Sequence, residues 1–270
     1  MVDSRPVLVF DSGLGGLSVL KAIQALLPER RSVYLADDAG FPYGERTDDD
    51  LVGRVMALIG EAVATYDPVA VVIACNTAST LVLPPLRARF AVPFIGTVPA
   101  IKPAAAQTQT GIVAVLATPG TMKRDYTHEL IRQFAGRCHV RLVGAPDLAM
   151  LAERHLAGEA VDMDVLVKQI GPCFVTLNGQ RTDTVVLACT HYSLLIDQMT
   201  AAAPWPVNWL DPAPAIARQV ARVLGAAAPA QLHQKQKNVA VFTSGRPASP
   251  AIVRLLRDFG LQTKTVAQAV

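Results

Sequence analysis

The sequence has little of what metal sites, disulfide frameworks and membrane segments require. Its 270 residues include only four cysteines, which form no C-x-x-C pair and show no zinc-type spacing to the five histidines. No apolar run is long enough to span a bilayer, and the N-terminal region lacks the apolar core of a secretory signal. We therefore expect no metal, no membrane association and reduced thiols in a cytoplasmic protein.

Charge is also scarce, and neither sign is in large excess. Charged residues make up 17% of the chain, the net charge is +3 and no basic cluster stands out, so we expect no nucleic-acid partner. Hydrophobic residues make up 51%, and the chain is therefore long and apolar enough for one large domain or two moderate ones.

Two short apolar runs each end in a cysteine. Residues 71–74 precede Cys75 and residues 185–188 precede Cys189, which places the cysteines 189 − 75 = 114 residues apart. Such runs are typical of buried parallel strands, and the small hydroxylated residues that follow are typical of helix N-termini. Each cysteine is therefore expected at the carboxyl end of a strand, where open α/β sheets bind ligands.

A second pair of segments repeats in the same order, because residues 7–13 resemble residues 113–120. Two pairs of similar segments in the same order indicate a duplicated α/β unit. We predict two pseudo-symmetric α/β domains with mainly parallel sheets and an active site in the cleft between them, with one thiol from each side. The clear strands are expected at 6–10, 33–36, 69–74, 93–97, 111–117, 184–188, 207–210 and 238–243, and helices at 17–27, 148–157 and 250–259, the last capped by Ser249.

Two loops carry polar groups that a site requires. The glycine-rich loop 11–16 lets backbone N–H groups approach an anion at a helix N-terminus, but Ser18 stands where a dinucleotide fingerprint has its third glycine. The charge of Asp11 also opposes phosphate, and a tight turn is the simpler interpretation. The turn 41–44, which follows Asp37, either rims a polar pocket or is simply exposed.

The paired cysteines indicate a particular chemistry. A single buried cysteine is usually structural, and we interpret Cys138 and Cys173 in that way. A helix N-terminus lowers the pKa of a thiol, so Cys75 and Cys189 are expected to be reactive near neutral pH. Two thiols that face one carbon can remove a proton on one side and deliver one on the other, as a racemase or epimerase requires. Donors of the right types to stabilise the reacting carboxylate are Asn76, Thr77, Thr190 and the Ser12 loop, and groups able to exchange protons or steer an ammonium are Asp11, Glu153 and His191.

Four motifs in register resemble those of glutamate racemases, in the cofactor-independent aspartate/glutamate racemase superfamily. They are Phe10-Asp11-Ser12-Gly13-x-Gly15-Gly16-Leu17, Pro42-Tyr43-Gly44, Ala74-Cys75-Asn76-Thr77-Ala78 and Cys189-Thr190-His191-Tyr192. The resemblance covers essentially the whole chain. It implies interconversion of L- and D-glutamate without a cofactor, which supplies D-glutamate for bacterial peptidoglycan.

The resemblance also implies roles for individual residues. Cys75 would act on D-glutamate and Cys189 on L-glutamate, with Asp11, Asp37, Glu153 and His191 assisting. The sequence before Glu153 follows the family pattern only loosely. Substrate contacts would come from Asp11, Ser12, Pro42, Tyr43, Gly44, Asn76, Thr77, Thr118, Thr121, Thr190 and His191.

The implied organisation is a discontinuous first domain, residues 1–98 plus 211–270, enclosing a second domain, residues 99–210, in a homodimer. The chain begins ten residues before Asp11, which argues against the activation by a peptidoglycan precursor that is linked to longer N-termini in this family. Alternatives are a sibling racemase acting on aspartate or a hydantoin, and a small-acid binding protein without turnover. Nothing in the sequence separately supports a non-enzymatic role such as topoisomerase inhibition.

Overall fold

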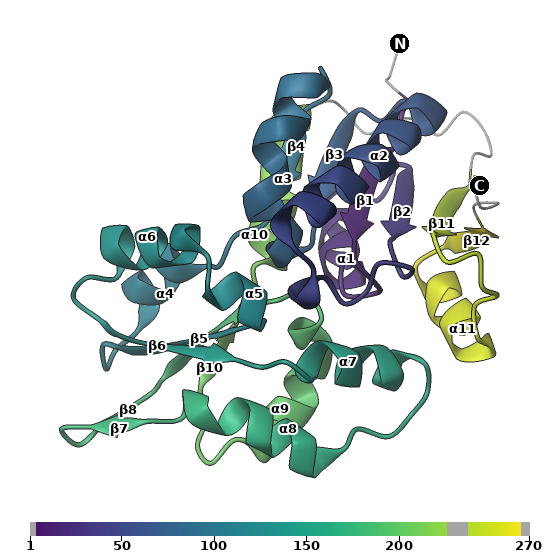
Figure 1. Ribbon diagram of the computed structural model, residues 1–270. Helices are drawn as coiled ribbons and strands as arrows, with labels where there is room; N and C mark the ends of the chain where they lie inside the picture. The colour runs from purple at the N-terminus through teal and green to yellow at the C-terminus, as the bar shows by residue number, and fades with distance from the viewer. Residues whose placement is uncertain (1–3, 226–236, 266–270) are drawn as a thin grey trace.

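A computed structural model describes residues 4–225 and 237–265 of the chain, and these residues form two parallel sheets (Figure 1). The six-stranded sheet has the order β12-β11-β2-β1-β3-β4, and the four-stranded sheet the order β10-β9-β5-β6. The strands of the first sheet are β1 (Val7–Asp11), β2 (Ser32–Ala36), β3 (Ala70–Ile73), β4 (Phe94–Gly96), β11 (Asn238–Phe242) and β12 (Leu261–Thr265). Those of the second are β5 (Ile112–Ala117), β6 (His139–Gly144), β9 (Thr184–Ala188) and β10 (Asn208–Leu210).

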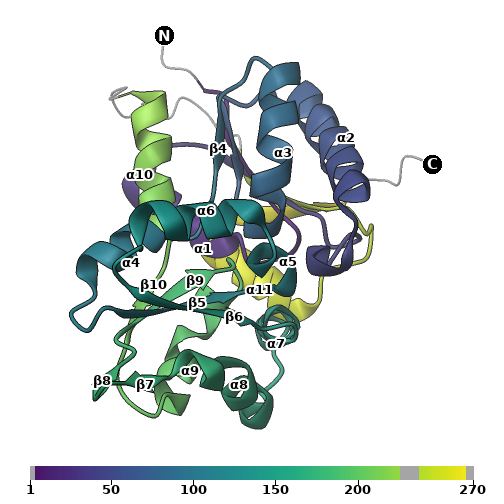
Figure 2. The same cartoon turned by 60° about the vertical axis from the view of Figure 1, so that its left-hand side comes forward.

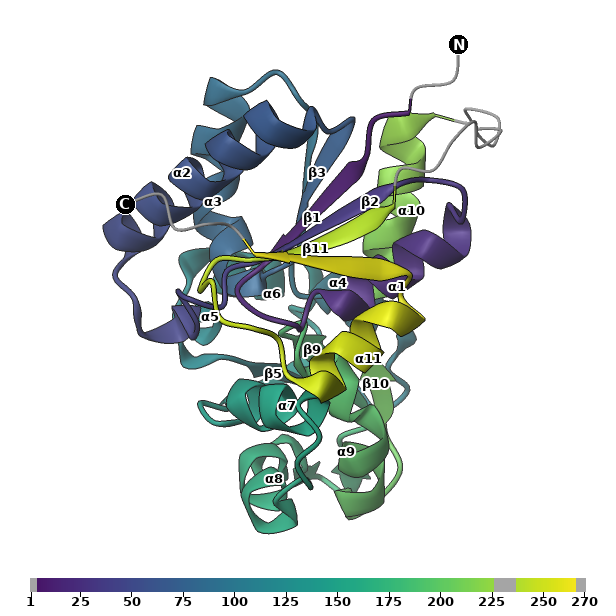
Figure 3. The same cartoon turned by 90° about the vertical axis from the view of Figure 1, so that its right-hand side faces the viewer.

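Helices cover both faces of the first sheet (Figure 3). Helices α2 (Asp48–Tyr66) and α3 (Asn76–Arg89) lie on one face, and α1 (Leu17–Leu26), α10 (Ala213–Leu224) and α11 (Pro250–Asp258) lie on the other. Side chains alternate along a strand, so Val7 and Val9 of β1 pack with α1 and α10 while Leu8 and Phe10 pack with α2 and α3. Because both faces of the sheet are buried at its centre, the central strands β1, β2 and β3 consist mainly of apolar residues.

The second sheet is covered in the same way (Figure 2). Helices α4 (Ile101–Gln107) and α6 (Asp125–Phe134) pack on one face, and α7 (Leu148–Leu156), α8 (Met163–Ile170) and α9 (Ile196–Ala202) pack on the other. Shorter elements are α5 (Pro119–Met122), the 3-10 turns η1 (Tyr43–Glu45), η2 (Gly171–Cys173) and η3 (Tyr192–Leu195), and the antiparallel hairpin β7 (Thr176–Leu177) and β8 (Gln180–Arg181).

The predicted fold class is confirmed, and each strand and helix expected from the sequence begins and ends within one residue of its position in the structure. The strands β6 and β12 and the hairpin β7–β8 lie outside the ranges expected from the sequence. Both β6 and β12 are edge strands with several polar residues, and β6 buries little of its surface. An edge strand needs few apolar residues, so its sequence lacks the apolar run that marks a central strand.

After β10 the chain returns to the first sheet, because α10 packs beside α1 on one face of that sheet. The exact domain limits, 98 and 211, stay a prediction, and part of the 211–270 segment lies outside the described residues. Among the helices that the structure describes, none combines the length and apolar character needed to cross a membrane.

Candidate active site

Cys75 and Cys189 line one pocket at the carboxyl ends of β3 and β9, one from each sheet. Both side chains are almost fully buried, and all four cysteines of the chain are free thiols. The pocket is lined by Ser12, Phe41, Pro42, Tyr43, Gly44, Cys75, Asn76 and Thr77 from the first part of the chain and by Thr118, Pro119, Pro146, Ala149, Cys189, Thr190 and His191 from the second.

Most of the expected site residues therefore lie together, and four do not line the pocket. Asp11, Asp37, Thr121 and Glu153 stand behind its wall and touch the lining residues through hydrogen bonds. Pro119, Pro146 and Ala149 line the pocket in addition to the expected residues, and Phe41 lines it as part of the turn 41–44 that the sequence offered as a pocket rim. Pro146 follows the unrecognised strand β6, whereas Phe41 is adjacent to the Pro-Tyr-Gly motif.

Three threonine hydroxyls join the two halves of the site. Thr77 Oγ1 lies 3.1 Å from Thr118 Oγ1 and 3.2 Å from Thr121 Oγ1. Thr118 is also the N-cap of α5, because its hydroxyl accepts a hydrogen bond from the Thr121 amide. The pocket wall from β3 is therefore tied to the wall from β5.

Asn76 presents an amide group that the fold leaves unpaired. The side chain is 3% exposed and lines the pocket at the first residue of α3, yet neither Oδ1 nor Nδ2 has a hydrogen-bond partner in the part of the chain described. A buried amide without partners is costly, so this pair of atoms is suited to a polar ligand.

On the second side, Cys189, His191 and Glu153 form a chain. His191 Nδ1 lies 3.8 Å from Cys189 Sγ, and Nε2 lies 2.7 Å from Glu153 Oε1. Burial disfavours a charged ring, but the hydrogen bonds to Cys189 and Glu153 prevail and raise the pKa of His191 well above its ordinary value. Both ring nitrogens then carry protons, so Nε2 donates to Glu153. Glu153 therefore contacts a pocket residue through His191, although it does not line the pocket itself.

The glycine-rich loop binds this carboxylate. The Leu14 amide donates to Glu153 Oε1 at 2.5 Å, so the anion at this loop is a side chain of the same protein. A Cβ at Gly13 would collide with Glu153, and one at Gly15 would overlap the His191 ring and lie 2.6 Å from Thr190 Oγ1. The loop therefore needs glycine where it meets the second half of the site.

Asp11 lies behind the Cys75 side of the pocket and is fully buried. Burial raises its pKa to about 6, although the positive charge of His191 lowers it. Its Oδ1 accepts a hydrogen bond from the Thr190 hydroxyl at 3.2 Å, and its Oδ2 lies 3.3 Å from the Gly13 amide.

The expected lowering of the Cys75 pKa is not found. Burial raises the pKa of the thiol, and the Asp11 charge adds to the rise, while the Ala78 amide and the Ser12 hydroxyl act in the opposite sense. Cys75 does precede α3, as predicted, but its desolvation outweighs the helix terminus. The other thiols lie elsewhere, with Cys173 buried in the second sheet's core and Cys138 partly exposed.

Within residues 4–225 and 237–265, no cluster of three or more His, Cys, Asp or Glu side chains is arranged to hold a metal ion. Fold and pocket together define a class of protein with two parallel α/β sheets and with two free thiols, at the ends of strands from different sheets, that face one pocket.

The chain belongs to the Asp/Glu/hydantoin racemase family, whose model matches residues 14–220. It is 56% identical over 263 residues to the glutamate racemase of Brucella canis, which covers 97% of this chain and 95% of that protein. The structure of Escherichia coli glutamate racemase in complex with L-glutamate and the activator UDP-MurNAc-ala matches with a TM-score of 0.88 and 41% identity, over 97% of each chain. Glutamate racemase from Thermus thermophilus matches with a TM-score of 0.71 and 27% identity, over 97% of this chain and 98% of that one.

Proposed function

We propose that this protein is a glutamate racemase that moves a proton at Cα, with Cys75 acting on D-glutamate and Cys189 on L-glutamate. The observation that carries the proposal is the entry of one free thiol from each sheet into the same pocket. Full-length similarity to proteins named glutamate racemase supports glutamate over aspartate or a hydantoin.

In the proposed reaction one cysteine acts as a thiolate and the other as a thiol. The thiolate takes the Cα proton, and the thiol on the opposite face gives its proton to the carbanion, so the product has the other hand and the two sulfurs have exchanged protonation states. His191, held protonated by Glu153, exchanges protons with Cys189. The Ser12 hydroxyl stabilises the thiolate of Cys75, and the charge of Asp11, behind the pocket wall, raises the pKa of that thiol.

The substrate carboxylate at the reacting carbon would bind at the N-terminus of α3, on backbone amides and the unpaired Asn76 side chain. Donors there become more effective as the carboxylate takes on enolate charge. The remaining proposed contacts are Asp11, Ser12, Pro42, Tyr43, Gly44, Thr77, Thr118, Thr121, Thr190 and His191.

The test follows both halves of the reaction. Purified protein with L-glutamate in deuterated buffer should lose optical rotation and gain deuterium at Cα, whereas aspartate and hydantoins should react far more slowly. A binding protein without turnover would show neither change, and that result would refute the proposal.

Single-thiol variants test the assignment of hands. Cys75→Ser and Cys189→Ser should each stop racemisation, because both proton transfers are needed. With a glutamate analogue that carries a leaving group on its β-carbon, Cys75→Ser should still eliminate from the L-form and Cys189→Ser from the D-form. Loss on the mutated side should be roughly 10²-fold or more. Equal impairment of both hands in each variant would contradict the facing-thiol arrangement.

The proposed cellular role is supply of D-glutamate for bacterial peptidoglycan by a cytoplasmic homodimer that needs no cofactor. Light scattering at several protein concentrations would test the dimer, and retention of racemisation after chelation would test independence from metal.

A further inference from the structure

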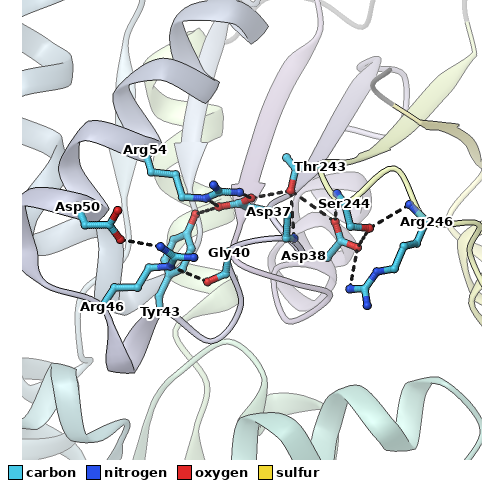
Figure 4. Close-up of polar contacts among 11 residues, drawn as sticks. Asp37, Asp38, Gly40, Tyr43, Arg46, Asp50, Arg54, Thr243, Ser244 and Arg246 are labelled. Carbon is cyan, nitrogen blue, oxygen red and sulfur yellow. Dashed lines mark hydrogen bonds and ion pairs between the residues drawn. The ribbon is translucent and has the colours of Figure 1, made fainter. Parts of the chain in front are cut away.

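Asp37 is fully buried at the end of β2, and hydrogen-bond donors surround its carboxylate (Figure 4). Its Oδ1 accepts from Arg54 Nη2 at 2.5 Å and from Thr243 Oγ1 at 2.6 Å. Its Oδ2 accepts from Arg54 Nε and from the Tyr43 hydroxyl, both at 2.5 Å. A carboxylate has about four acceptor positions, so none is left for a reacting group.

The charge state of this group follows from its partners. Burial opposes ionisation, but the hydrogen bonds from Arg54, Thr243 and Tyr43 lower the pKa of Asp37 below its ordinary value. Burial and the Asp37 charge together raise the pKa of Tyr43, so its hydroxyl stays protonated and donates. A carboxylate that remains ionised is a fixed anchor, and it is poorly suited to exchanging protons near neutral pH.

Tyr43 connects this anchor to the pocket. It belongs to the loop 41–44, all of whose residues line the pocket, and its ring is buried 6.4 Å from that of Phe10. At the other end of the loop, Phe41 packs on the His191 ring with centroids 5.4 Å apart. The loop 41–44 therefore extends from the Asp37 carboxylate, at the end of β2, to the imidazole of His191, which follows β9 of the second sheet.

Thr243 reaches Asp37 from a segment 206 residues away in the chain. It follows β11, which pairs with β2 so that Phe242 stands beside Ala36, and its amide donates to the Ala36 carbonyl at 3.1 Å. The next residue, Ser244, binds Asp38 through its amide at 2.9 Å and through its hydroxyl (Figure 4). Thr243 is thus held on both sides, and it lies beyond residues 14–220 that match the family model.

We propose that Arg54 and Thr243 are positioning residues, which act through Asp37 and the Tyr43 hydroxyl to hold the loop 41–44 against the bound amino acid. The proposal rests on the proposed function for its substrate. It assigns Asp37 to anchoring the pocket loop instead of to proton exchange.

A matched pair of substitutions tests the role of Thr243. Thr243→Val keeps the shape and removes the hydroxyl, whereas Thr243→Ser keeps the hydroxyl. A lost hydrogen bond to a buried carboxylate should loosen the loop, so Thr243→Val is expected to raise KM for L-glutamate about tenfold and to change kcat less than about twofold. Thr243→Ser should restore the wild-type KM. Arg54→Lys, which keeps the charge and loses the two-pronged contact, should raise KM at least as much.

A second readout needs no turnover. The rate at which iodoacetamide alkylates Cys75, followed by peptide mass spectrometry, should rise about fivefold in Thr243→Val and stay at the wild-type value in Thr243→Ser, because a loosened loop exposes the pocket. If wild-type protein fails to racemise glutamate, the proposed function falls while the alkylation rates still decide the positioning role. Unchanged KM and alkylation with only a lowered Tm would mean a purely structural Thr243 and overturn the proposal. A fall in kcat at constant KM would also overturn it, because it would place Asp37 in the chemical step.

Discussion

Replacement of Asp11 by asparagine should stabilise the protein at neutral pH and weaken it in acid. In the native state burial raises the pKa of Asp11 to about 6, against an ordinary value of 3.8. At pH 7.5 the carboxyl group is ionised in both the native and the unfolded state. The rise in its native pKa then corresponds to a loss of roughly 3 kcal/mol in the free energy of unfolding. The pKa of Asp11 is higher in the native state than in the unfolded chain. Its favourable contribution to the free energy of unfolding is therefore fully present below the pKa of the unfolded chain and is lost as the pH rises through about 6.

Asparagine is neutral at every pH and nearly the same size. Its side-chain oxygen can accept one of the two hydrogen bonds that Asp11 receives from the Thr190 hydroxyl and the Gly13 amide, and loss of the other costs about 1 kcal/mol. Asp11→Asn should therefore gain roughly 2 kcal/mol in the free energy of unfolding at pH 7.5 and lose about 1 kcal/mol at pH 4.

The assay is urea unfolding of wild type and variant at both pH values, with Asp258→Asn as a control at an exposed position. Racemisation measured in parallel should fall on the order of 10²-fold, since the carboxylate beside Cys75 is gone. A stability difference that is the same at pH 4 and pH 7.5 would refute the argument, because it would mean that Asp11 is not ionised at a cost. If Asp11→Asn kept full activity, Asp11 would have no role in the reaction, and the predicted pH dependence of stability would be unaffected.

Two further substitutions test the second side of the pocket. Glu153→Gln removes the charge that helps raise the pKa of His191, so the alkaline limb of the kcat/KM profile should move to lower pH, whereas Glu159→Gln at an exposed position should leave it in place. An unmoved limb in Glu153→Gln would contradict a protonated His191 in the reaction. Gly15→Ala places a Cβ against the His191 ring and should lower both Tm and kcat. Gly53→Ala, where a Cβ meets nothing within 4 Å, should instead stabilise the protein by about 0.5–1 kcal/mol. If the two variants behaved alike, the glycine-rich loop 11–16 would be able to move away from the ring.

The amino-acid sequence by itself determined the central strands and the place of both thiols. Each of these features has a local cause: an apolar run buried on both faces, a turn rich in glycine, or a hydroxyl that caps a helix. Thr47, followed by three acidic residues, begins α2 as such a cap, and Ser249 begins α11. Edge strands such as β6 and β12 escaped prediction because they bury only part of their surface.

Only the tertiary structure decided which strand ends meet and what charge their side chains carry. Glu153 binds an amide 139 residues away, and Thr243 binds a carboxylate 206 residues away, because the order of parallel strands brings these ends together. Neither contact has a signal in the nearby sequence. The pKa of Cys75 shows the same limit: the helix that follows it is a local feature and favours the thiolate, whereas burial and the Asp11 charge depend on the whole fold and prevail.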